Sequence, residues 1–338
     1  MRAWLLEKQA PVEDQPLVLR DVPDPQPVDD EIRIQVRACG VCRTDVHITE
    51  GDLPLKTSPL ILGHEVVGVV DQTGRNVTTF TVGERAGVAW LNWACGTCTF
   101  CVSKRENLCR SARFTGWSEN GGFAGYVTVS EGFAFPLPDD RAFSEMAPWM
   151  CPGIAGYRSL RLTEVGEGDA VGLYGFGVTA AYVLQIAKHR GIKTYVVTRS
   201  PENQATAVSL GADWVGGYED ALPVKLAAGI IFPPAGNLVN FALGQLDRGG
   251  KLVLAPVTMT PINLVDYNRL WMEREVKTLA NITRQDGKAF LKLAEDIEMK
   301  TKVQVFHFNR LPDALIAVKK GTIKANAVIA IDRGEDPV

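Results

Sequence analysis

Near the middle of the chain runs Ala170-Val171-Gly172-Leu173-Tyr174-Gly175-Phe176-Gly177-Val178-Thr179-Ala180, a short apolar run followed by a glycine-rich turn and a helix-like segment. The turn fits the pattern G-x-G-x-x-A. In this pattern the first glycine bends the chain, the second lets the backbone approach a pyrophosphate, and the small last residue allows close helix–strand packing. The stretch therefore predicts a dinucleotide-binding strand–turn–helix. Its candidate cofactor-binding residues are Gly175, Phe176, Gly177 and Val178.

Strand-like and helix-like segments alternate on the C-terminal side of this turn. They are 178–190, 193–198, 201–210, 228–232, 236–246, 251–255 and 276–280. Such alternation with short joins predicts a doubly wound parallel sheet with helices on both faces. The fold class is therefore α/β for this part of the chain.

The N-terminal 150 residues have a different pattern, with short strand-like runs such as 32–37, 66–70 and 126–129 between glycine-containing loops. They predict a β-rich domain. After Thr283 we expect a helix to about Met299, a strand over 303–308, a helix over 313–320 and a last strand over 327–331. The chain thus combines a β-rich unit with a doubly wound α/β unit.

The composition is that of an ordinary globular protein, with 338 residues, 46% of them apolar and 22% charged, and a net charge of -3. It excludes a disordered, collagenous or disulfide-dense chain and argues against an electrostatic nucleic-acid binder. The uncharged segment 170–187 fits a buried strand and helix better than a membrane span. Glu7 and Lys8 interrupt the N-terminus before a secretory core can form, so we expect a cytoplasmic protein.

Four of the seven cysteines lie close together with the spacing C-x2-C-x2-C-x7-C. They are Cys95, Cys98, Cys101 and Cys109. Four thiolates can close a tetrahedral zinc site, which would be structural because no position stays open for a substrate. An iron–sulfur cluster uses similar spacing, and four free cysteines are the plainest alternative.

A second group of metal-binding residue types is spread along the chain. Cys42 and His64 supply two candidate ligands, and Cys151 is the expected third, which would leave the open fourth position of a catalytic zinc. Each of them has an alternative interpretation as a buried core residue. Cys39 has no partner motif and is expected in the core.

The end of the next predicted strand bears on the choice of cofactor. An acidic residue there would hold the ribose of NAD, but the sequence is Val196-Val197-Thr198-Arg199-Ser200. Arg199 and the hydroxyls of Thr198 and Ser200 could instead bind a 2′-phosphate. We therefore favour NADP over NAD, while a solvated Arg199 beside a permissive NAD site is the alternative.

Taken together, these motifs resemble the zinc-dependent alcohol dehydrogenases of the medium-chain dehydrogenase/reductase superfamily. Gly63-His64-Glu65-Val66-Val67-Gly68 is similar to the G-H-E zinc signature of that family. The four-cysteine loop is similar to its structural-zinc lobe, and residues 175–180 to its nucleotide fingerprint. The resemblance runs through nearly the whole chain, including 135–138 and 249–251. It implies an oxidoreductase that interconverts alcohols with aldehydes or ketones by hydride transfer to or from NAD(P).

The resemblance also implies a domain plan and an assembly. A GroES-like catalytic domain would comprise 1–152 and 286–338, with the structural zinc lobe at 95–109. A Rossmann domain would occupy 153–285. Two Zn²⁺ ions per chain and a homodimer or homotetramer are expected, with a small alcohol, aldehyde or ketone as the partner molecule and neither nucleic acid nor membrane.

Roles follow for individual residues by position in the matching motifs. Cys42, His64 and Cys151 would hold the catalytic zinc. Glu65 would lie near the metal, and Asp45 would form a hydrogen bond with His64. Arg43 would contact the cofactor pyrophosphate. Thr44 and His47 would form a proton relay.

Two further positions bear on the substrate. Trp90 matches a pocket tryptophan of microbial ethanol dehydrogenases, while their second pocket aromatic is replaced by Leu53. This departure favours alcohols larger than ethanol, including aromatic or cinnamyl-type alcohols, and Trp93 and Trp117 could also line the pocket.

The alternative functions are a zinc-free quinone or enoyl reductase on the same fold and a non-catalytic, zinc-stabilised binding protein.

Overall fold

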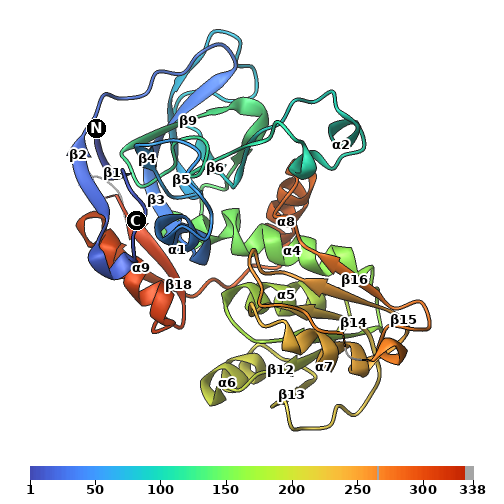
Figure 1. Ribbon diagram of the computed structural model, residues 1–338. Coiled ribbons are helices and arrows are strands. Elements are labelled where there is room, and N and C mark those ends of the chain that lie inside the picture. The colour runs from blue at the N-terminus through green and yellow to red at the C-terminus, as the bar shows by residue number, and fades with distance from the viewer. Residues whose placement is uncertain (265, 332–338) are drawn as a thin grey trace. The chain divides into compact units, whose positions relative to one another are not determined.

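The structure is a computed structural model that describes residues 1–264 and 266–331 (Figure 1). The chain divides into two compact units. Unit 1 contains Met1–Cys151, Asn281–Glu295 and the described residues from Lys300 onward, and unit 2 contains Pro152–Ala280 and Asp296–Met299. Residues 332–338, which the sequence assigns to the catalytic domain, lie outside the described residues.

Unit 1 is built around a sheet in which the long strand β3 (Glu31–Val41) is central. The sheet order is β10-β6-β5-β3-β18-β17, and β9 also pairs with β3. The remaining strands of this sheet are β5 (Glu65–Thr73), β6 (Arg85–Val88), β9 (Tyr126–Ser130), β10 (Ala134–Pro136), β17 (Val303–His307) and β18 (Asn326–Ala330). Strand β18 pairs antiparallel with β3, so the end of the described chain completes a sheet begun near its start.

Smaller elements surround this sheet. The short strands are β1 (Arg2–Leu6), β2 (Leu17–Asp21), β4 (Leu60–Ile61), β7 (Leu91–Trp93) and β8 (Arg113–Phe114). The helices are α1 (Arg43–Glu50), α2 (Thr99–Val102), α3 (Phe143–Met146), α8 (Arg284–Asp296, in this unit up to Glu295) and α9 (Leu311–Lys320). Single 3₁₀ turns are η1 (Val12–Asp14), η2 (Glu106–Leu108), η3 (Glu131–Phe133), η4 (Ala147–Met150) and η6 (Phe308–Arg310).

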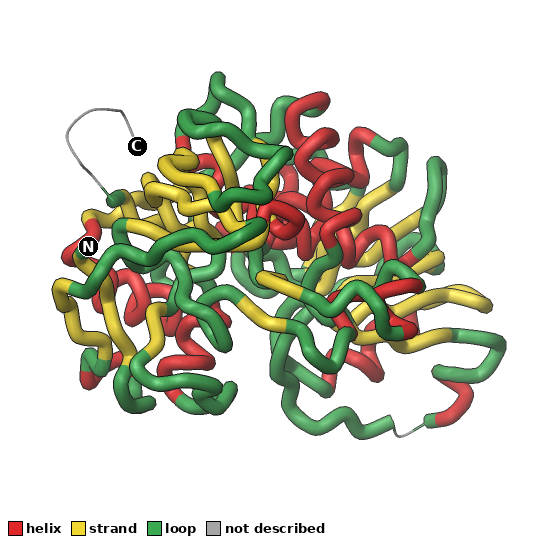
Figure 2. Tube along the Cα trace, turned by 90° about the horizontal axis from the view of Figure 1, so that it is seen from above, coloured by secondary structure: helices red, strands yellow, loops and turns green. Residues whose placement is uncertain are grey.

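Unit 2 is a six-stranded parallel sheet with the order β13-β12-β11-β14-β15-β16. Its strands are β11 (Ala170–Tyr174), β12 (Lys193–Val197), β13 (Trp214–Gly216), β14 (Leu226–Ile231), β15 (Leu246–Leu254) and β16 (Glu275–Thr278). Its helices are α4 (Pro152–Thr163), α5 (Val178–His189), α6 (Pro201–Ser209) and α7 (Asn237–Gln245), with the turn η5 (Tyr267–Arg269). Strands β11 and β14 are buried at nearly every position, as expected for a parallel sheet covered by helices. Figure 2 shows the strands of the molecule in yellow and its helices in red.

The strand order of unit 2 reverses direction between β11 and β14, which is where ligands bind in doubly wound sheets. The predicted Rossmann-like sheet is therefore confirmed. Several strand boundaries differ from the prediction, most of all that of β15, which begins at Leu246 and not at 251 because a register irregularity accommodates the pair Gly249-Gly250 within the strand.

Candidate active site and metal centres

The first candidate metal centre starts at the N-terminus of α1. Cys42 is the N-cap residue, and its Sγ accepts a hydrogen bond from the Thr44 backbone N–H at 3.5 Å. Asp45 closes the capping box because its Oδ2 accepts the Cys42 backbone N–H at 2.8 Å. The other carboxylate oxygen of this fully buried Asp45 lies 3.1 Å from Nδ1 of His64. Asp45 thus holds the helix terminus and the imidazole together.

Four candidate ligands meet at this point. Cys42, His64, Glu65 and Cys151 each offer a ligand atom, and all four atoms lie within 4.8 Å of one another. The Sγ atoms of Cys42 and Cys151 are 4.0 Å apart. Within the described residues, Nε2 of His64 is buried and has no hydrogen-bond partner. A buried imidazole nitrogen without a partner is costly, so these residues fit a metal ion that would accept the nitrogen lone pair.

Glycine makes room for the carboxylate of this group. Gly40 on β3 lies against Glu65, and a Cβ at position 40 would overlap Oε2 of Glu65. Burial, followed by the charge of Cys42, holds the pKa of Glu65 well above its usual range.

The pKa values of the Cys42 and Cys151 thiols are shifted in opposite directions. A hydrogen bond from Cys151 holds the pKa of the Cys42 thiol well below its ordinary value, with His64 contributing. The same hydrogen bond and burial raise the pKa of Cys151. Burial alone would lower the pKa of His64, but the charge and hydrogen bond of Asp45 raise it. The group therefore retains protons that a divalent cation would displace on binding.

The second candidate centre is the four-cysteine loop around α2. Sγ of Cys95 lies 3.8 Å from Sγ of Cys101 and 3.6 Å from that of Cys109, and Cys98 and Cys101 are 3.6 Å apart. Tetrahedral zinc with bonds of about 2.3 Å places its sulfur ligands about 3.8 Å apart, so the spacing fits. All four cysteines are free thiols and form a group that could hold a metal ion.

Proton affinities also differ within the loop. Backbone N–H groups of Thr97 and Cys98 lower the pKa of Cys95 to about 6. Burial, followed by the hydrogen bond to Cys98, raises the pKa of Cys101 to about 12.

The loop is tied to α8, because the buried carboxylate of Glu106 accepts hydrogen bonds from the backbone N–H and Nε of Arg284 at 3.0 and 3.3 Å.

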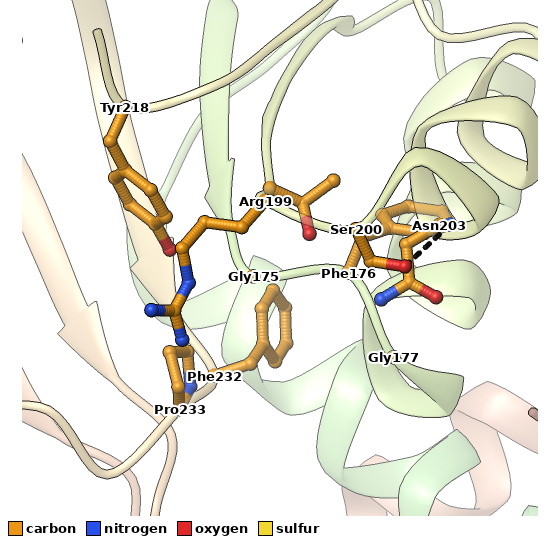
Figure 3. Close-up of a pocket in the computed structure, with 10 residues that line it drawn as sticks. Gly175, Phe176, Gly177, Arg199, Ser200, Asn203, Tyr218, Phe232 and Pro233 are labelled. Carbon is orange, nitrogen blue, oxygen red and sulfur yellow. Dashed lines mark hydrogen bonds between the residues drawn. The ribbon is translucent and has the colours of Figure 1, made fainter. Parts of the chain in front are cut away.

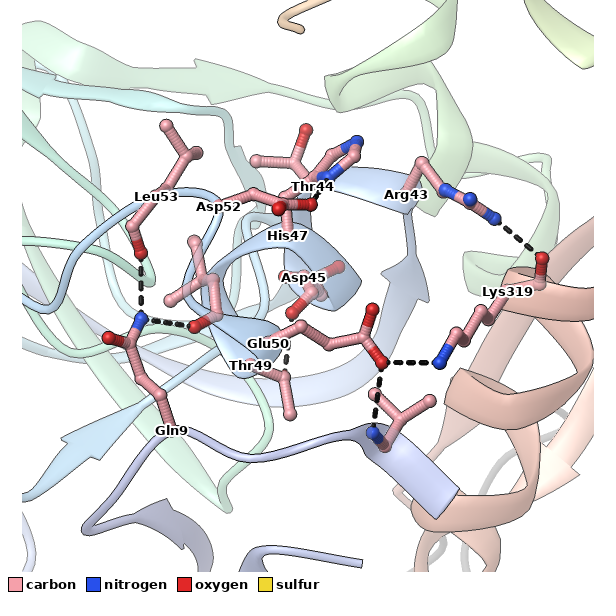
Figure 4. A network of polar contacts seen from close by, with 12 residues as sticks. Gln9, Arg43, Thr44, Asp45, His47, Thr49, Glu50, Asp52, Leu53 and Lys319 are labelled. Atoms are coloured by element: carbon pink, nitrogen blue, oxygen red, sulfur yellow. Dashed lines mark hydrogen bonds and ion pairs between the residues drawn. The ribbon is translucent and has the colours of Figure 1, made fainter. Parts of the chain in front are cut away.

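The predicted relay residues lie on α1. Thr44 is buried with its Oγ1 3.6 Å from Sγ of Cys42. His47 follows three residues later, and its Nδ1 lies 2.6 Å from Oδ2 of Asp52 (Figure 4). Sequence reasoning missed Asp52, because nothing in the local pattern indicates that the chain after α1 turns back to this imidazole.

Aromatic side chains form one wall beside His64. Trp90 meets the imidazole edge to face at a centroid distance of 5.1 Å and stacks on Phe114 and Trp117 at 5.3 and 5.7 Å. The Trp117 indole N–H donates to the carbonyl of Pro54 at 2.9 Å. The loop that contains Leu53 is therefore tied to this aromatic stack.

A cavity of about 510 Å³ lies at the glycine-rich turn of unit 2 (Figure 3). Its lining residues are Gly175, Phe176, Gly177, Thr198, Arg199, Ser200, Asn203, Tyr218, Phe232 and Pro233. All predicted cofactor residues of this unit line it except Val178, which begins α5. Arg43 is a unit 1 residue and is not part of the lining. Asn203 and Tyr218 were missed, because a polar residue on a helix and a tyrosine after an edge strand carry no motif.

The turn itself requires glycine. Gly175 has a φ of 77°, and a Cβ there would lie 2.7 Å from Cδ of Pro233. Gly177 is the N-cap of α5 and provides no side-chain acceptor, so first-turn N–H groups are available for a phosphate.

The fold and these groups define a two-unit α/β protein with a dinucleotide turn and two groups that could bind metal. Residues 28–139 match the family described as "Alcohol dehydrogenase GroES-like domain". The chain is 40% identical over 337 residues to "Probable alcohol dehydrogenase AdhA" of Mycobacterium tuberculosis, covering 98% of this chain and 97% of that protein.

Two solved structures are similar along their length. A cinnamyl alcohol dehydrogenase of Sorghum bicolor gives a TM-score of 0.89 at 25% identity, covering 100% of this chain and 99% of that one. A cobalt- and zinc-bound thermostable alcohol dehydrogenase of Pyrobaculum aerophilum also gives 0.89 at 25% identity, covering 98% and 99%.

The chain therefore belongs to the alcohol dehydrogenase family, as the resemblance of its motifs predicts. The predicted fold class, a GroES-like unit with a Rossmann-like unit, is confirmed. No helix in residues 1–264 and 266–331 has the length and apolar character needed to cross a membrane.

Proposed function

We propose that this alcohol dehydrogenase is zinc-dependent and interconverts alcohols with aldehydes or ketones, with NADP preferred over NAD. The observation that carries the zinc assignment is the buried Nε2 of His64, which has no hydrogen-bond partner among the described residues and faces the sulfur atoms of Cys42 and Cys151. Two Zn²⁺ ions per chain are proposed, one in each cysteine-containing group.

The candidate metal ligands at the N-terminus of α1 and their neighbours have separate proposed roles. Cys42, His64 and Cys151 would hold zinc, with Glu65 near enough to approach it. Zinc supplies Lewis acidity that lowers the pKa of an alcohol, and a nicotinamide supplies the hydride acceptor. Asp45 orients the His64 ring through its 3.1 Å contact, which keeps Nε2 directed toward the metal position.

Two residues of α1 are proposed to handle the proton. The buried hydroxyl of Thr44 is the proposed acceptor of the alcohol proton. His47 would exchange that proton with solvent, and Asp52 at 2.6 Å holds its ring. Arg43 is proposed to supply a guanidinium to the cofactor pyrophosphate.

The substrate class is proposed from the aromatic wall beside His64. Trp90, Phe114 and Trp117 form a stacked surface, and Leu53 takes the place of a bulkier aromatic residue. These features support benzylic or cinnamyl-type alcohols, and the similarity to a sorghum cinnamyl alcohol dehydrogenase is consistent with them. The homodimer or homotetramer and the cytoplasmic location remain predictions.

The proposal is tested by zinc analysis together with steady-state kinetics. We expect two zinc ions per chain and higher kcat/KM with NADP than with NAD across short aliphatic, long aliphatic and benzylic alcohols. Zinc-free protein that reduces quinones or enoyl substrates would identify the reductase alternative. Protein that gains no thermal stability from either dinucleotide would identify a non-catalytic binding protein.

Arg199 provides a separate test of the cofactor preference. Its side chain lines the cavity at the turn and extends beside Tyr218 (Figure 3). Hydrogen bonds to a charged group contribute about 1.5–3 kcal/mol, so Arg199→Ala is expected to lower kcat/KM for NADP roughly 10- to 100-fold and leave the value for NAD nearly unchanged. Arg190→Ala is the matched control, because Arg190 belongs to the same unit but contacts the ring of Tyr157 and does not line the cavity. An equal loss for both cofactors in Arg199→Ala would contradict the NADP assignment.

A further inference from the structure

A lysine near the C-terminal end of α9 joins three separate segments of unit 1 (Figure 4). Nζ of Lys319 lies 2.7 Å from Oε2 of Glu13 in η1 and 2.7 Å from Oε1 of Glu50, the last residue of α1. The same oxygen of Glu50 accepts the backbone N–H of Val12 at 3.0 Å. One ammonium group therefore holds the end of α9 against the end of α1 and against η1.

The backbone of the same helix end holds Arg43, the first residue of α1. Nη1 of Arg43 donates to the carbonyl oxygen of Lys319 at 2.6 Å and to that of Val318 at 3.4 Å. Among the described residues, Nε and Nη2 of Arg43 have no hydrogen-bond partner. A guanidinium has five N–H donors in a rigid planar fork, so one nitrogen is anchored while the others can still bind a phosphate.

We propose that Lys319 is a positioning residue for Arg43 and thereby strengthens the binding of the cofactor pyrophosphate. The inference rests on the proposed function, in which Arg43 contacts that pyrophosphate. Lys319 acts through two linked connections. Its side chain fixes the last turn of α9 to Glu13 and Glu50, and its carbonyl, which is part of that turn, fixes the guanidinium.

The physical reason is preorganisation. Helix ends fray, and the carbonyls of the last turn have no partner within the helix. Those carbonyls also carry the negative end of the helix dipole, which attracts a cation such as Arg43. When the turn is held in place, Arg43 occupies one position before the cofactor arrives, and less side-chain freedom is lost on binding.

A direct electrostatic role of the Lys319 charge is the competing explanation, and the acidic partners distinguish the two. If Lys319 only attracts phosphate, removing Glu50 should leave cofactor binding unchanged or strengthen it, because a negative charge disappears. If Lys319 positions Arg43, removing Glu50 should weaken binding, because the turn loses an attachment.

The test compares dissociation constants for NADPH, measured by fluorescence titration, with kcat at saturating cofactor. Exposed ion pairs are each worth about 0.2–1 kcal/mol, so Lys319→Met and Glu50→Ala are each expected to raise the Kd at least about 1.5-fold and up to about 5-fold per ion pair lost, with kcat unchanged. Lys320→Met is the matched control for charge, because Lys320 is the adjacent, exposed lysine and acts on Glu13 through its charge alone, without an ion pair among the described residues. Its Kd should equal that of the wild type.

A double-mutant cycle with Arg43→Gln identifies the residue through which Lys319 acts. In that background, Lys319→Met should cause no further loss of NADPH affinity. Additive losses, or a Glu50→Ala variant that binds NADPH as tightly as the wild type, would overturn the inference. If Glu50→Ala fails to fold, Glu13→Ala tests the same attachment. Wild-type protein that binds neither NADPH nor NADH would overturn the proposed function together with the inference, whereas wild-type binding with unchanged variants would overturn the inference alone.

Discussion

Replacing Cys42 by alanine is expected to abolish alcohol oxidation and to remove one of two zinc ions per chain. The substitution deletes a thiolate whose Sγ lies 4.0 Å from that of Cys151 and leaves His64 Nε2 with an incomplete set of neighbouring ligands. Lewis-acid stabilisation of a transition state amounts to several kcal/mol, and each 1.4 kcal/mol corresponds to a factor of about ten in rate. We therefore expect kcat/KM to fall about a thousandfold or more.

Cys39→Ala is the matched control for this experiment. Cys39 is a fully buried cysteine of unit 1 that belongs to neither metal-binding group. It should retain both zinc ions and the wild-type rate. The assignment of Cys42 would be wrong if Cys42→Ala kept two zinc ions by elemental analysis or oxidised alcohols at the wild-type rate.

The second large effect is expected from Cys95→Ser, which should unfold the loop 95–109 locally. No residue of α2 is buried, so this helix has no apolar core and is expected to depend on the four thiolates for order. Structural zinc sites contribute about 10–16 kcal/mol of apparent folding free energy in isolated peptides. Loss of one zinc ion per chain and rapid tryptic cleavage after the exposed Lys104 or Arg105 are the expected results.

Mass spectrometry of a limited tryptic digest, with zinc analysis of the same sample, measures both effects. Wild-type protein treated with a chelator should be cut at the same sites, and Cys39→Ala should resist cleavage as the wild type does. Cys95→Ser protein with an intact loop and unchanged zinc content would show that the cysteines are not metal ligands. It would then favour the alternative of four free thiols.

Local patterns in the sequence predicted the Rossmann-like sheet well, because each of its elements has its own apolar period and its own turn signal. The strand 170–174 and the helix that begins at Val178 are found as expected. Helix α4 was not predicted, because Pro152, Gly153 and Gly156 read as helix breakers. The structure shows the reason for Gly156, since a Cβ there would lie 3.2 Å from the carbonyl oxygen of Thr179 on the neighbouring helix. Close packing between α4 and α5 therefore overrides helix propensity.

The sequence predicted those residues of the candidate site that lie within recognisable motifs. The spacing of the cysteines and the Gly-His-Glu segment identify groups that the structure brings together as potential metal ligands. Asp52, Asn203 and Lys319 could not be found in this way, because each acts through a contact created by tertiary folding. Lys319 lies more than 250 residues from both Glu13 and Glu50, and no pattern in one sequence links them.

The place of β18 in the sheet of unit 1 has a consequence for biosynthesis. This strand lies between β3 and β17, and its first residue, Asn326, comes 285 positions after Val41, the end of β3. At a translation rate of 5–20 residues per second, β3 emerges from the ribosome roughly 15 to 60 s before this neighbour. During that interval an apolar strand edge stays open while the nearly contiguous unit 2 can already fold. The nascent chain is therefore most exposed to aggregation and chaperone capture between the synthesis of its first sheet strands and that of its last one.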